Sequence, residues 1–354
     1  MRVTTFLVAF LAASAATAQS ATSEHRLLVA NKAESTLSIF DPTTRKEVAT
    51  LPTGTGPHEV AVAPDGSLAV VTDYGDQKPG RTLTVVDPFA GKLLRTITLE
   101  AEEVDPDGKK ATKSFLRPHG VQFVAAGKVV VTSEAARRLL LVDVATGRIE
   151  RTWSTPQGTM HMVAVDKACR RAAATSIRDG NVAFFGLDAD GTTAAPPVAC
   201  GDQSEGLAVD PVTGATWVGN RAANTLTVLD DKGVVTHTLT TAEFPFRIAF
   251  TPDGGRALVT CAEGGVVQVF DATTRQAIRE ISISGDRSEQ GALPMGITTD
   301  ETGARAYVTC GRGEFVAVLD VEKGELIDRL PARKGCDGIA WARRVAPATP
   351  RLTR

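Results

Sequence analysis

One unit of 41 to 61 residues is repeated along this chain of 354 residues, and this repeat restricts the fold more than any other feature. Each copy reads as a strand, a polar turn, a second strand, and then two further strands around a V-x-D element. Alternating apolar residues and Asp-Gly turns indicate strands and hairpins, and no stretch keeps a helical period. Four antiparallel strands at this spacing are typical of the blades of a β-propeller. The seven copies begin at Pro57, Pro118, Met160, Ser204, Pro245, Pro294 and Cys336.

The two chain ends together complete the seventh copy. That copy stops after one strand, whereas residues 26–30, 36–40 and 46–51 read as three strands before the first copy. We therefore expect an all-β protein, a seven-bladed β-propeller of four-stranded antiparallel blades whose last blade is closed by N- and C-terminal strands. Such a closure pairs edges that would otherwise stay open and fixes the chain ends.

An export signal is predicted at residues 1–18. Arg2 precedes an apolar run, and small residues end this run at Ala18. The rest of the chain then forms one propeller domain over 19–343 and a polar, basic tail over 344–354, which we expect to be disordered. No later segment has the roughly 18 apolar residues that a membrane span requires. We expect a periplasmic or secreted protein without a membrane span.

The charge balance excludes one class of partner. Without the signal, 38 basic side chains face 41 acidic ones, so the chain exerts no long-range attraction on nucleic acid. We expect no nucleic-acid partner. The expected partner is a small molecule or a periplasmic protein, bound by a monomer.

The repeat motifs resemble those of a known family. The motifs are P-x-G/E-V-A-x-x-P-D-G, V-T-x at the end of the second strand, and V-x-D-x-x-T-G at the third. Over residues 26–343 the chain resembles the YVTN-repeat (YncE-like) propellers of the wider lactonase-like superfamily. That superfamily includes ligand binders, lactone hydrolases and a lactonising cycloisomerase, so the resemblance implies the fold more strongly than an activity.

One position of the repeat is rich in histidine. In a propeller the first strand of each blade lines the central channel, so equivalent residues at its start form a ring at the channel mouth. Five consecutive members can bind a metal or move protons, and Phe246 and Met295 are expected to form an apolar wall opposite them. The five-membered arc consists of Asp337, His58, His119, His161 and Glu205.

The arc permits two kinds of chemistry. Three imidazoles with a carboxylate fit a divalent metal, Zn²⁺ or Cu²⁺, with His58, His119, His161 and Glu205 as candidate ligands. Without metal, a histidine would act as general base, Glu205 as acid, and Arg178 or Arg247 would hold a substrate carboxylate. The resemblance to the cycloisomerase branch implies catalytic roles for His161, Glu205 and Arg247. Arg247, however, is one position off the ring, and strand alternation predicts that it points into the blade.

Other features are expected near the same mouth. Asp73 and its equivalents at the ends of the second strands are expected to support the ring and to contact a ligand. Three insertions, 74–81, 100–117 and 284–293, are candidate lids or partner surfaces. Five cysteines leave at least one free thiol in an oxidising compartment, and Cys310 with Cys336 is the first disulfide to test.

Three functional interpretations remain open at this level. The first is an exported propeller that binds a small ligand, a metal ion or a partner protein at its mouth. The second is a lactone hydrolase, cycloisomerase or metal-assisted hydrolase that uses the same arc. The third, by analogy with other propellers, is an accessory factor to a periplasmic redox or cofactor pathway. A separate alternative assigns no chemistry to the histidines, because the mouth of a wet channel is polar in any case.

Overall fold

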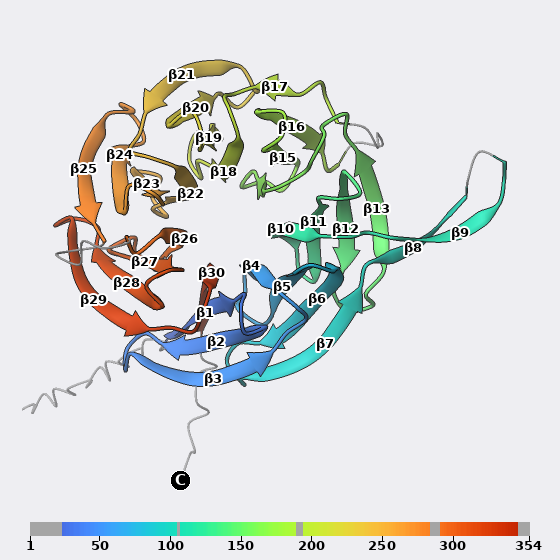
Figure 1. Cartoon of the computed structure of the whole chain (residues 1–354), viewed down its shortest axis with the longest axis horizontal. Helices are drawn as coiled ribbons and strands as arrows, with labels where there is room; N and C mark the ends of the chain where they lie inside the picture. The colour runs from blue at the N-terminus through green and yellow to red at the C-terminus, as the bar shows by residue number, and fades with distance from the viewer. Residues whose placement is uncertain (1–22, 105–106, 189–193, 284–290, 346–354) are drawn as a thin grey trace, which may run out of the picture.

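The computed structural model describes residues 23–104, 107–188, 194–283 and 291–345, and within these ranges it contains strands and no helix. Seven four-stranded antiparallel sheets surround a central channel, as Figure 1 shows. The predicted seven-bladed β-propeller is therefore confirmed. The predicted signal peptide, 1–18, and residues 346–354 of the predicted tail lie outside the described residues.

Each blade runs from an inner strand at the channel to an outer strand at the rim. Six blades follow the chain directly: β4 (Pro57–Val62), β5 (Ala69–Gly75), β6 (Pro79–Asp87) and β7 (Lys92–Thr98); β10 (Pro118–Ala125), β11 (Lys128–Ser133), β12 (Arg138–Asp143) and β13 (Ile149–Ser154); β14 (Val163–Val165), β15 (Arg171–Ser176), β16 (Asn181–Gly186) and β17 (Val198–Ala199); β18 (Ser204–Val209), β19 (Thr216–Asn220), β20 (Thr225–Leu229) and β21 (Val235–Thr240); β22 (Pro245–Phe250), β23 (Arg256–Cys261), β24 (Val266–Asp271) and β25 (Ala277–Ser282); β26 (Pro294–Thr299), β27 (Arg305–Cys310), β28 (Phe315–Asp320) and β29 (Glu325–Pro331).

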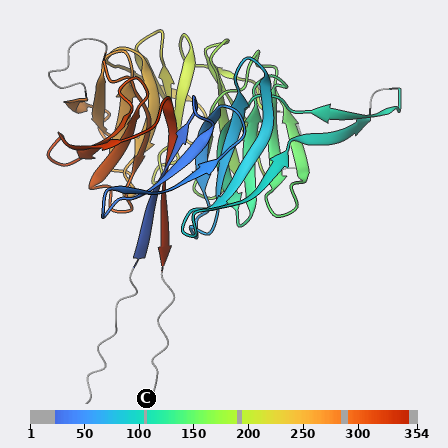
Figure 2. The same ribbon diagram turned by 60° about the horizontal axis from the view of Figure 1, so that its bottom comes forward.

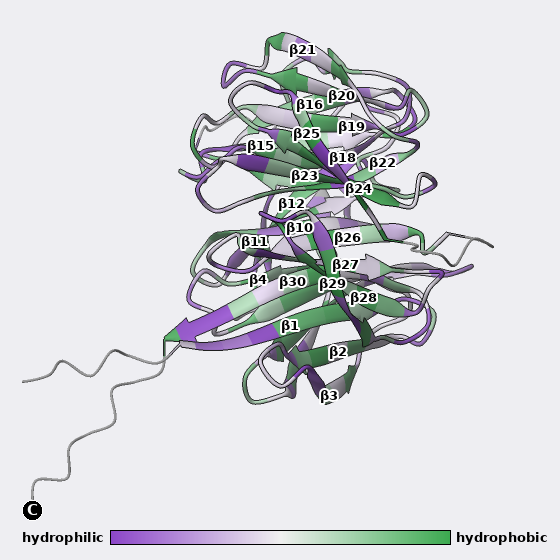
Figure 3. Ribbon diagram, turned by 90° about the vertical axis from the view of Figure 1, so that its left-hand side faces the viewer, coloured by the Kyte–Doolittle hydropathy of each residue, from purple (hydrophilic) through white to green (hydrophobic). Residues whose placement is uncertain are grey.

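The seventh blade is built from both ends of the chain, as predicted. Its order from the channel outward is β30 (Cys336–Val345), β1 (Ser23–Asn31), β2 (Thr36–Asp41) and β3 (Lys46–Pro52). The ends of β1 and β30 project from one face of the ring, where their surface is hydrophilic (Figures 2 and 3). There Ser23 is opposite Val345, and Arg344 forms an ion pair of 2.5 Å with Glu24. The ordered strand thus continues two residues beyond the predicted domain boundary at 343, because β1 supplies it with a partner.

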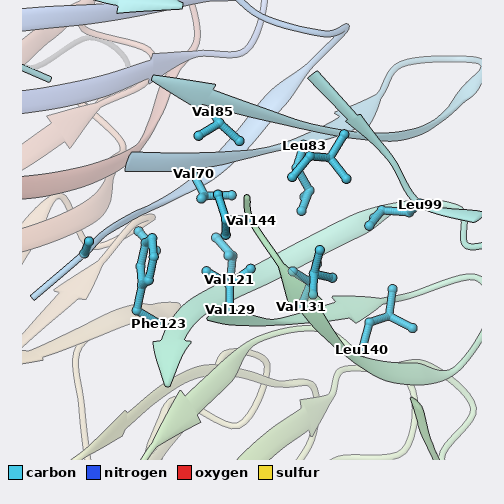
Figure 4. Close-up of a cluster of buried hydrophobic side chains, with 14 of the residues drawn as sticks. Val70, Leu83, Val85, Leu99, Val121, Phe123, Val129, Val131, Leu140 and Val144 are labelled. Atoms are coloured by element: carbon cyan, nitrogen blue, oxygen red, sulfur yellow. The ribbon is translucent and has the colours of Figure 1, made fainter. Parts of the chain in front are cut away.

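The core consists of apolar layers between neighbouring blades. The second and third strands of a blade are buried on both sides, whereas outer strands such as β3 and β7 are mostly exposed. Figure 4 shows one such layer, in which Val70 and Leu83 of one blade pack towards Val121, Val129 and Val131 of the next. Each fully buried aliphatic side chain contributes about 1.5–3 kcal/mol. The repeated layers make the ring a rigid support for its channel.

The insertion 100–117 does not cover the mouth, contrary to the lid interpretation. Its strands β8 (Glu100–Val104) and β9 (Lys110–Ser114) form a separate hairpin that projects outward from the rim of the ring (Figures 1 and 2). Leu99 and Phe115 fix its base in the core, and neither is exposed. Residues 105–106 of this hairpin and 284–290 of the insertion 284–293 lie outside the described residues.

Candidate metal centre at the channel mouth

A β-bulge at the start of most inner strands sets the geometry of the mouth. In β4, Pro57 is opposite Asp73, but the next partners are Val60 and Val71, so one extra residue is accommodated. The same irregularity occurs in β10, β18, β22 and β26. Because a bulge interrupts side-chain alternation, the ring residue and the residue after it both face the mouth.

Threonine hydroxyls tie most ring residues to the neighbouring blade. Thr132 accepts a hydrogen bond from the backbone N–H of Gly120 and donates one of 2.6 Å to the carbonyl oxygen of His161. Thr72 donates in the same way to the carbonyl oxygen of His119 at 2.8 Å. These threonines are the T of the V-T-x motif. The motif therefore positions the backbone of His119 and His161.

The predicted five-membered arc forms a continuous series of contacts. Asp337 Oδ2 lies 3.2 Å from His58 Nδ1. The ring centroids of His58 and His119 are 4.0 Å apart, and those of His119 and His161 are 3.6 Å apart. His161 Nε2 lies 2.7 Å from Glu205 Oε1. All five side chains are buried, so the mouth is a packed polar cluster rather than an open wet surface.

His119 is the least satisfied member of the arc. It is 1% exposed, and neither of its ring nitrogens has a hydrogen-bond partner. Burial, together with the neighbouring His161 and His58, lowers the pKa of His119 well below its usual value. A neutral imidazole has one N–H donor and one acceptor nitrogen, and such groups are normally paired when buried. His119 is therefore a neutral imidazole with two free nitrogens that could bind a cation.

Glu205 fixes the orientation of His161. Its carboxylate also accepts hydrogen bonds from Arg247 at 2.8 Å and Arg221 at 2.7 Å. Burial alone would raise the pKa of Glu205, but His161 and these two guanidinium groups hold it well below its usual range. An ionised carboxylate only accepts hydrogen bonds, so His161 donates through Nε2 and its Nδ1 is left without a partner. Glu205 is consequently unsuited to the role of proton donor considered for it above.

Arg247 points into the mouth, and the expectation that it points into the blade is wrong. The bulge in β22 brings its guanidinium to Glu205 and, at 2.6 Å, to Glu59 on the far side of the channel. Burial would raise the pKa of Glu59, but Arg247 more than offsets this and lowers it to about 2. Beyond this ion pair the channel continues as a cavity of about 560 Å³, lined by apolar side chains such as Val60 and Phe250.

Glu59 was missed by the sequence analysis, although the repeat contains a signal for it. Most copies have glycine at the position that follows the ring residue, and a Cβ there would collide with the next blade. At Gly338 a Cβ would lie 2.0 Å from the carbonyl oxygen of His58, and at Gly120 it would lie 2.5 Å from the backbone nitrogen of Val163. A charged side chain at this glycine position, as in Glu59 and Arg247, marks a blade that sends a second group into the mouth.

Two three-residue groups in the cluster have the spacing of metal ligands. One is His58, Glu59 and His119, and the other is His119, Glu134 and His161; in each group the ligand atoms lie within 4.8 Å of one another. Glu205, the predicted carboxylate ligand, is in neither group, and its oxygens accept hydrogen bonds from His161, Arg221 and Arg247. Glu134 takes its place in the second group.

Glu134 and Tyr74 were also missed. Glu134 follows the end of β11, and its buried Oε2 has no hydrogen-bond partner and lies 3.7 Å from His161 Nδ1. Tyr74 belongs to the insertion 74–81, and its ring meets those of His58 and His119 edge-on, each at 5.4 Å between centroids. Burial and the nearby Glu134 raise the pKa of Tyr74 to about 12. Neither residue is at the ring position, so repeat alignment alone did not reveal them.

The remaining predicted residues have different locations. Phe246 is buried beneath the guanidinium of Arg247, 4.2 Å from its ring centroid, and Met295 is half-buried beside Gly311. Asp337 lies 3.8 Å from Lys32 at the rim. Arg178 lies in the exposed turn between β15 and β16, and none of its described contacts joins it to the cluster.

Asp73, at the end of a second strand, does not contact the ring residues, which corrects the prediction for it. Asp73 is completely buried and accepts hydrogen bonds from Thr82 and Thr84 of its own blade. Asn31 and Asn220, at the equivalent positions, contact the same kind of hydroxyls, but their amide groups donate the hydrogen bonds. These side chains connect the second and third strands.

The cysteines take no part in the cluster. All five are free thiols, so the predicted Cys310–Cys336 disulfide is not formed. Cys310 and Cys336 are both fully buried, and burial raises the pKa of Cys336 to about 12. Neither thiol belongs to a group with the spacing of metal ligands among the described residues.

Comparisons with known proteins support the fold alone. No family model matches the chain, and no curated protein matches its sequence, so the YVTN-repeat resemblance is not confirmed. A solved structure of a functionally unknown protein from Desulfotomaculum acetoxidans DSM 771 superposes with a TM-score of 0.68 at 15% identity, over 90% of this chain and 98% of that one. No helix in the described part of the chain is long and apolar enough to cross a membrane.

Proposed function

We propose that this propeller binds a divalent transition-metal ion at its channel mouth through His119, Glu134 and His161. The observation that carries the proposal is that several buried nitrogen and oxygen atoms without hydrogen-bond partners lie close together. These atoms are both ring nitrogens of His119, Nδ1 of His161 and Oε2 of Glu134. Leaving such atoms unpaired costs about 1–3 kcal/mol each, and one cation would satisfy several of them together.

The donor set indicates which metals fit. Two imidazoles and a carboxylate suit Zn²⁺, and imidazole also suits Cu²⁺ and Ni²⁺. The hydrogen bond from His161 to Glu205 is the arrangement that fixes the tautomer of a metal-binding histidine and raises its basicity. Arg221 and Arg247 in turn hold Glu205 in place. The apo cluster is thus already ordered for an ion.

Metal analysis of the mature protein tests this proposal. Protein prepared without chelators, and protein soaked with ZnSO₄ or CuSO₄ and then dialysed, are compared by plasma mass spectrometry. We expect at least one equivalent of metal in the wild type and a loss of metal in His119→Ala and Glu134→Gln. His237→Ala, which removes an exposed histidine on β21, is the control and should bind as the wild type does. A wild-type protein that takes up no metal after either soak would overturn the proposal.

A second candidate function is a metal-assisted hydrolase, within the lactonase-like range that the repeat resembles. Its support is the number of ligands: three protein groups leave coordination positions for water and substrate. The metal-free route has less support, because Glu205 stays ionised. Hydrolysis of a panel of lactones and esters by zinc-loaded protein, compared with His119→Ala, tests this activity. If the zinc-loaded wild type hydrolyses no substrate faster than His119→Ala does, the hydrolase function is contradicted and metal binding remains.

We also propose that the protein is exported and that it belongs to the YVTN-repeat propellers. The predicted signal precedes Ser23, where β1 begins on the projecting hydrophilic end rather than at the mouth. Removal of residues 1–18 would therefore leave the cluster untouched. The intact mass of protein from the periplasmic fraction tests export: a mature chain beginning at Gln19 supports it, and an uncleaved cytoplasmic chain contradicts it.

A further inference from the structure

We infer that the mouth binds two divalent cations, with the imidazole of His119 as a bridging ligand between them. This inference rests on the proposed metal-binding function and extends it. Its starting point is that both ligand groups contain His119: one is completed by Glu134 and His161, the other by His58 and Glu59. No other residue belongs to both groups.

The position of His119 fits a bridge. Its ring lies between those of His58 and His161, with centroid distances of 4.0 and 3.6 Å. Both of its nitrogens are buried and without partners, whereas a histidine that binds a single ion normally donates its other N–H to a protein group. His161 has such an acceptor in Glu205, and His119 has none. A cation on each nitrogen would satisfy the whole imidazole.

The second group has its own supply of donor atoms. His58 Nδ1 is buried without a hydrogen-bond partner, 3.7 Å from Glu59 Oε1 and 3.2 Å from Asp337 Oδ2. Glu59 Oε1 accepts hydrogen bonds from the guanidinium of Arg247, whereas Glu59 Oε2 makes no hydrogen bond among the described residues. Asp337 Oδ1 is also buried and unpaired. The imidazole of His58 and the carboxylate of Glu59 thus lie within ligand distance of His119, and Asp337 lies beside His58.

The proton balance of the bridge is simple. A neutral imidazole offers one lone pair, which the first ion takes. Binding of the second ion breaks the remaining N–H bond of His119 and forms a metal–nitrogen bond, and the proton leaves to the buffer. Two ions therefore bring four positive charges while one proton departs. Four buried or half-buried carboxylates surround the histidines and offset most of this charge: Glu59, Glu134, Glu205 and Asp337. Arg221 and Arg247 already pair with two of them.

Counting bound ions separates this inference from the proposed function. The mature protein is titrated with Zn²⁺ by calorimetry in two buffers of different ionisation enthalpy, and its zinc content after dialysis is measured. Two ions per chain, with a proton released on the second, support the bridge. One ion per chain overturns the bridge and leaves the proposed function standing. No bound zinc overturns the bridge, and it overturns the proposed function as well if copper is not taken up either.

Single variants then locate the two ions. His58→Ala and His161→Ala should each bind one ion, because each removes a ligand of one group only. His119→Ala should lose the second ion and weaken the first, and His237→Ala should still bind two. Circular dichroism confirms that each variant is folded, and the wild-type count does not depend on any of them. Equal loss of both ions in His58→Ala would contradict the separate groups.

Copper distinguishes a bridged pair from two isolated ions. In copper(II)-loaded wild type, coupling through the imidazolate should reduce the integrated electron-paramagnetic-resonance signal below the copper content at low temperature. In His58→Ala, which keeps one ion, signal and copper content should agree. A full, uncoupled signal from two copper ions in the wild type would overturn the bridging role of His119.

Discussion

His161 Nε2 and Glu205 Oε1 are 2.7 Å apart, and this hydrogen bond fixes which nitrogen of His161 can bind a cation. The two residues are at the same position of consecutive repeats, on neighbouring blades. Glu205 also forms ion pairs with Arg221 and Arg247. These contacts hold the carboxylate, and through it the imidazole of His161, in one orientation. The propeller scaffold thereby fixes the orientation of the His161 side chain.

Glu205→Gln should weaken metal binding without removing any ligand. The amide still accepts the N–H of His161, but it no longer carries the charge that strengthens this hydrogen bond and the basicity of the ring. Loss of such a partner typically costs about 10- to 100-fold in metal affinity. Competition with a chromophoric zinc chelator measures the change. Glu325→Gln, at an exposed position on β29, is the control, and unchanged affinity in Glu205→Gln would show that the contact is unimportant for binding.

Arg247→Met should destabilise the apo protein, because it leaves Glu59 and Glu205 buried with less positive charge. Removing one partner of a buried ion pair costs about 3–5 kcal/mol in the free energy of unfolding. Urea denaturation measures this change. Glu59→Gln combined with Arg247→Met should recover part of the loss, because the unpaired charge is then gone. If the changes in unfolding free energy of Arg247→Met and Glu59→Gln simply add in the double variant, Arg247 and Glu59 do not interact directly across the channel.

The sequence predicted the site residues correctly where equivalent positions of the repeat have the same backbone geometry. Because the inner strands are superposable, the arc from Asp337 to Glu205 could be predicted without knowledge of any contact. Strand alternation failed at Arg247, since the bulge turns two successive side chains towards the mouth. Glu134 follows the end of β11 and Tyr74 lies near the end of β5, where the copies differ in length, and no periodic signal indicates them.

Shortening the β8–β9 hairpin tests the correction to the lid prediction. A variant that replaces residues 101–113 with a short Gly-Ser turn keeps Leu99 and Phe115, which fix the base in the core. We expect its zinc affinity to match that of the wild type, because the hairpin projects away from the mouth (Figure 1). The exposed Lys–Glu pairs that this variant loses contribute about 0–1 kcal/mol each, and the loss of Ala101, which packs against the core, adds to the cost in stability. A loss of zinc affinity with unchanged folding would restore a role for the hairpin at the site.

Asp73→Asn should make the stability of the protein less dependent on pH. Burial raises the pKa of Asp73 from 3.8 to about 6, although the hydroxyls of Thr82 and Thr84 partly oppose this. The folded state therefore binds this proton more tightly than the unfolded state, and stability must fall as the pH rises from about 4 to about 6. Above that range the ionised carboxylate costs on the order of 3 kcal/mol, since each unit of pKa shift corresponds to about 1.4 kcal/mol.

The equivalent residues of other blades show that an amide fits at this position. Asn31 donates to Thr36 and Ser38, and Asn220 donates to Thr225 and Thr227, each at 2.8–3.1 Å. Asp73→Asn should thus be more stable than the wild type at pH 7.5, and the difference should disappear below about pH 4, where Asp73 is protonated in both states. Thermal melting at pH 3.5, 5.5 and 7.5 measures this. A variant less stable than the wild type at pH 7.5 would mean that Asp73 is needed as a charged group.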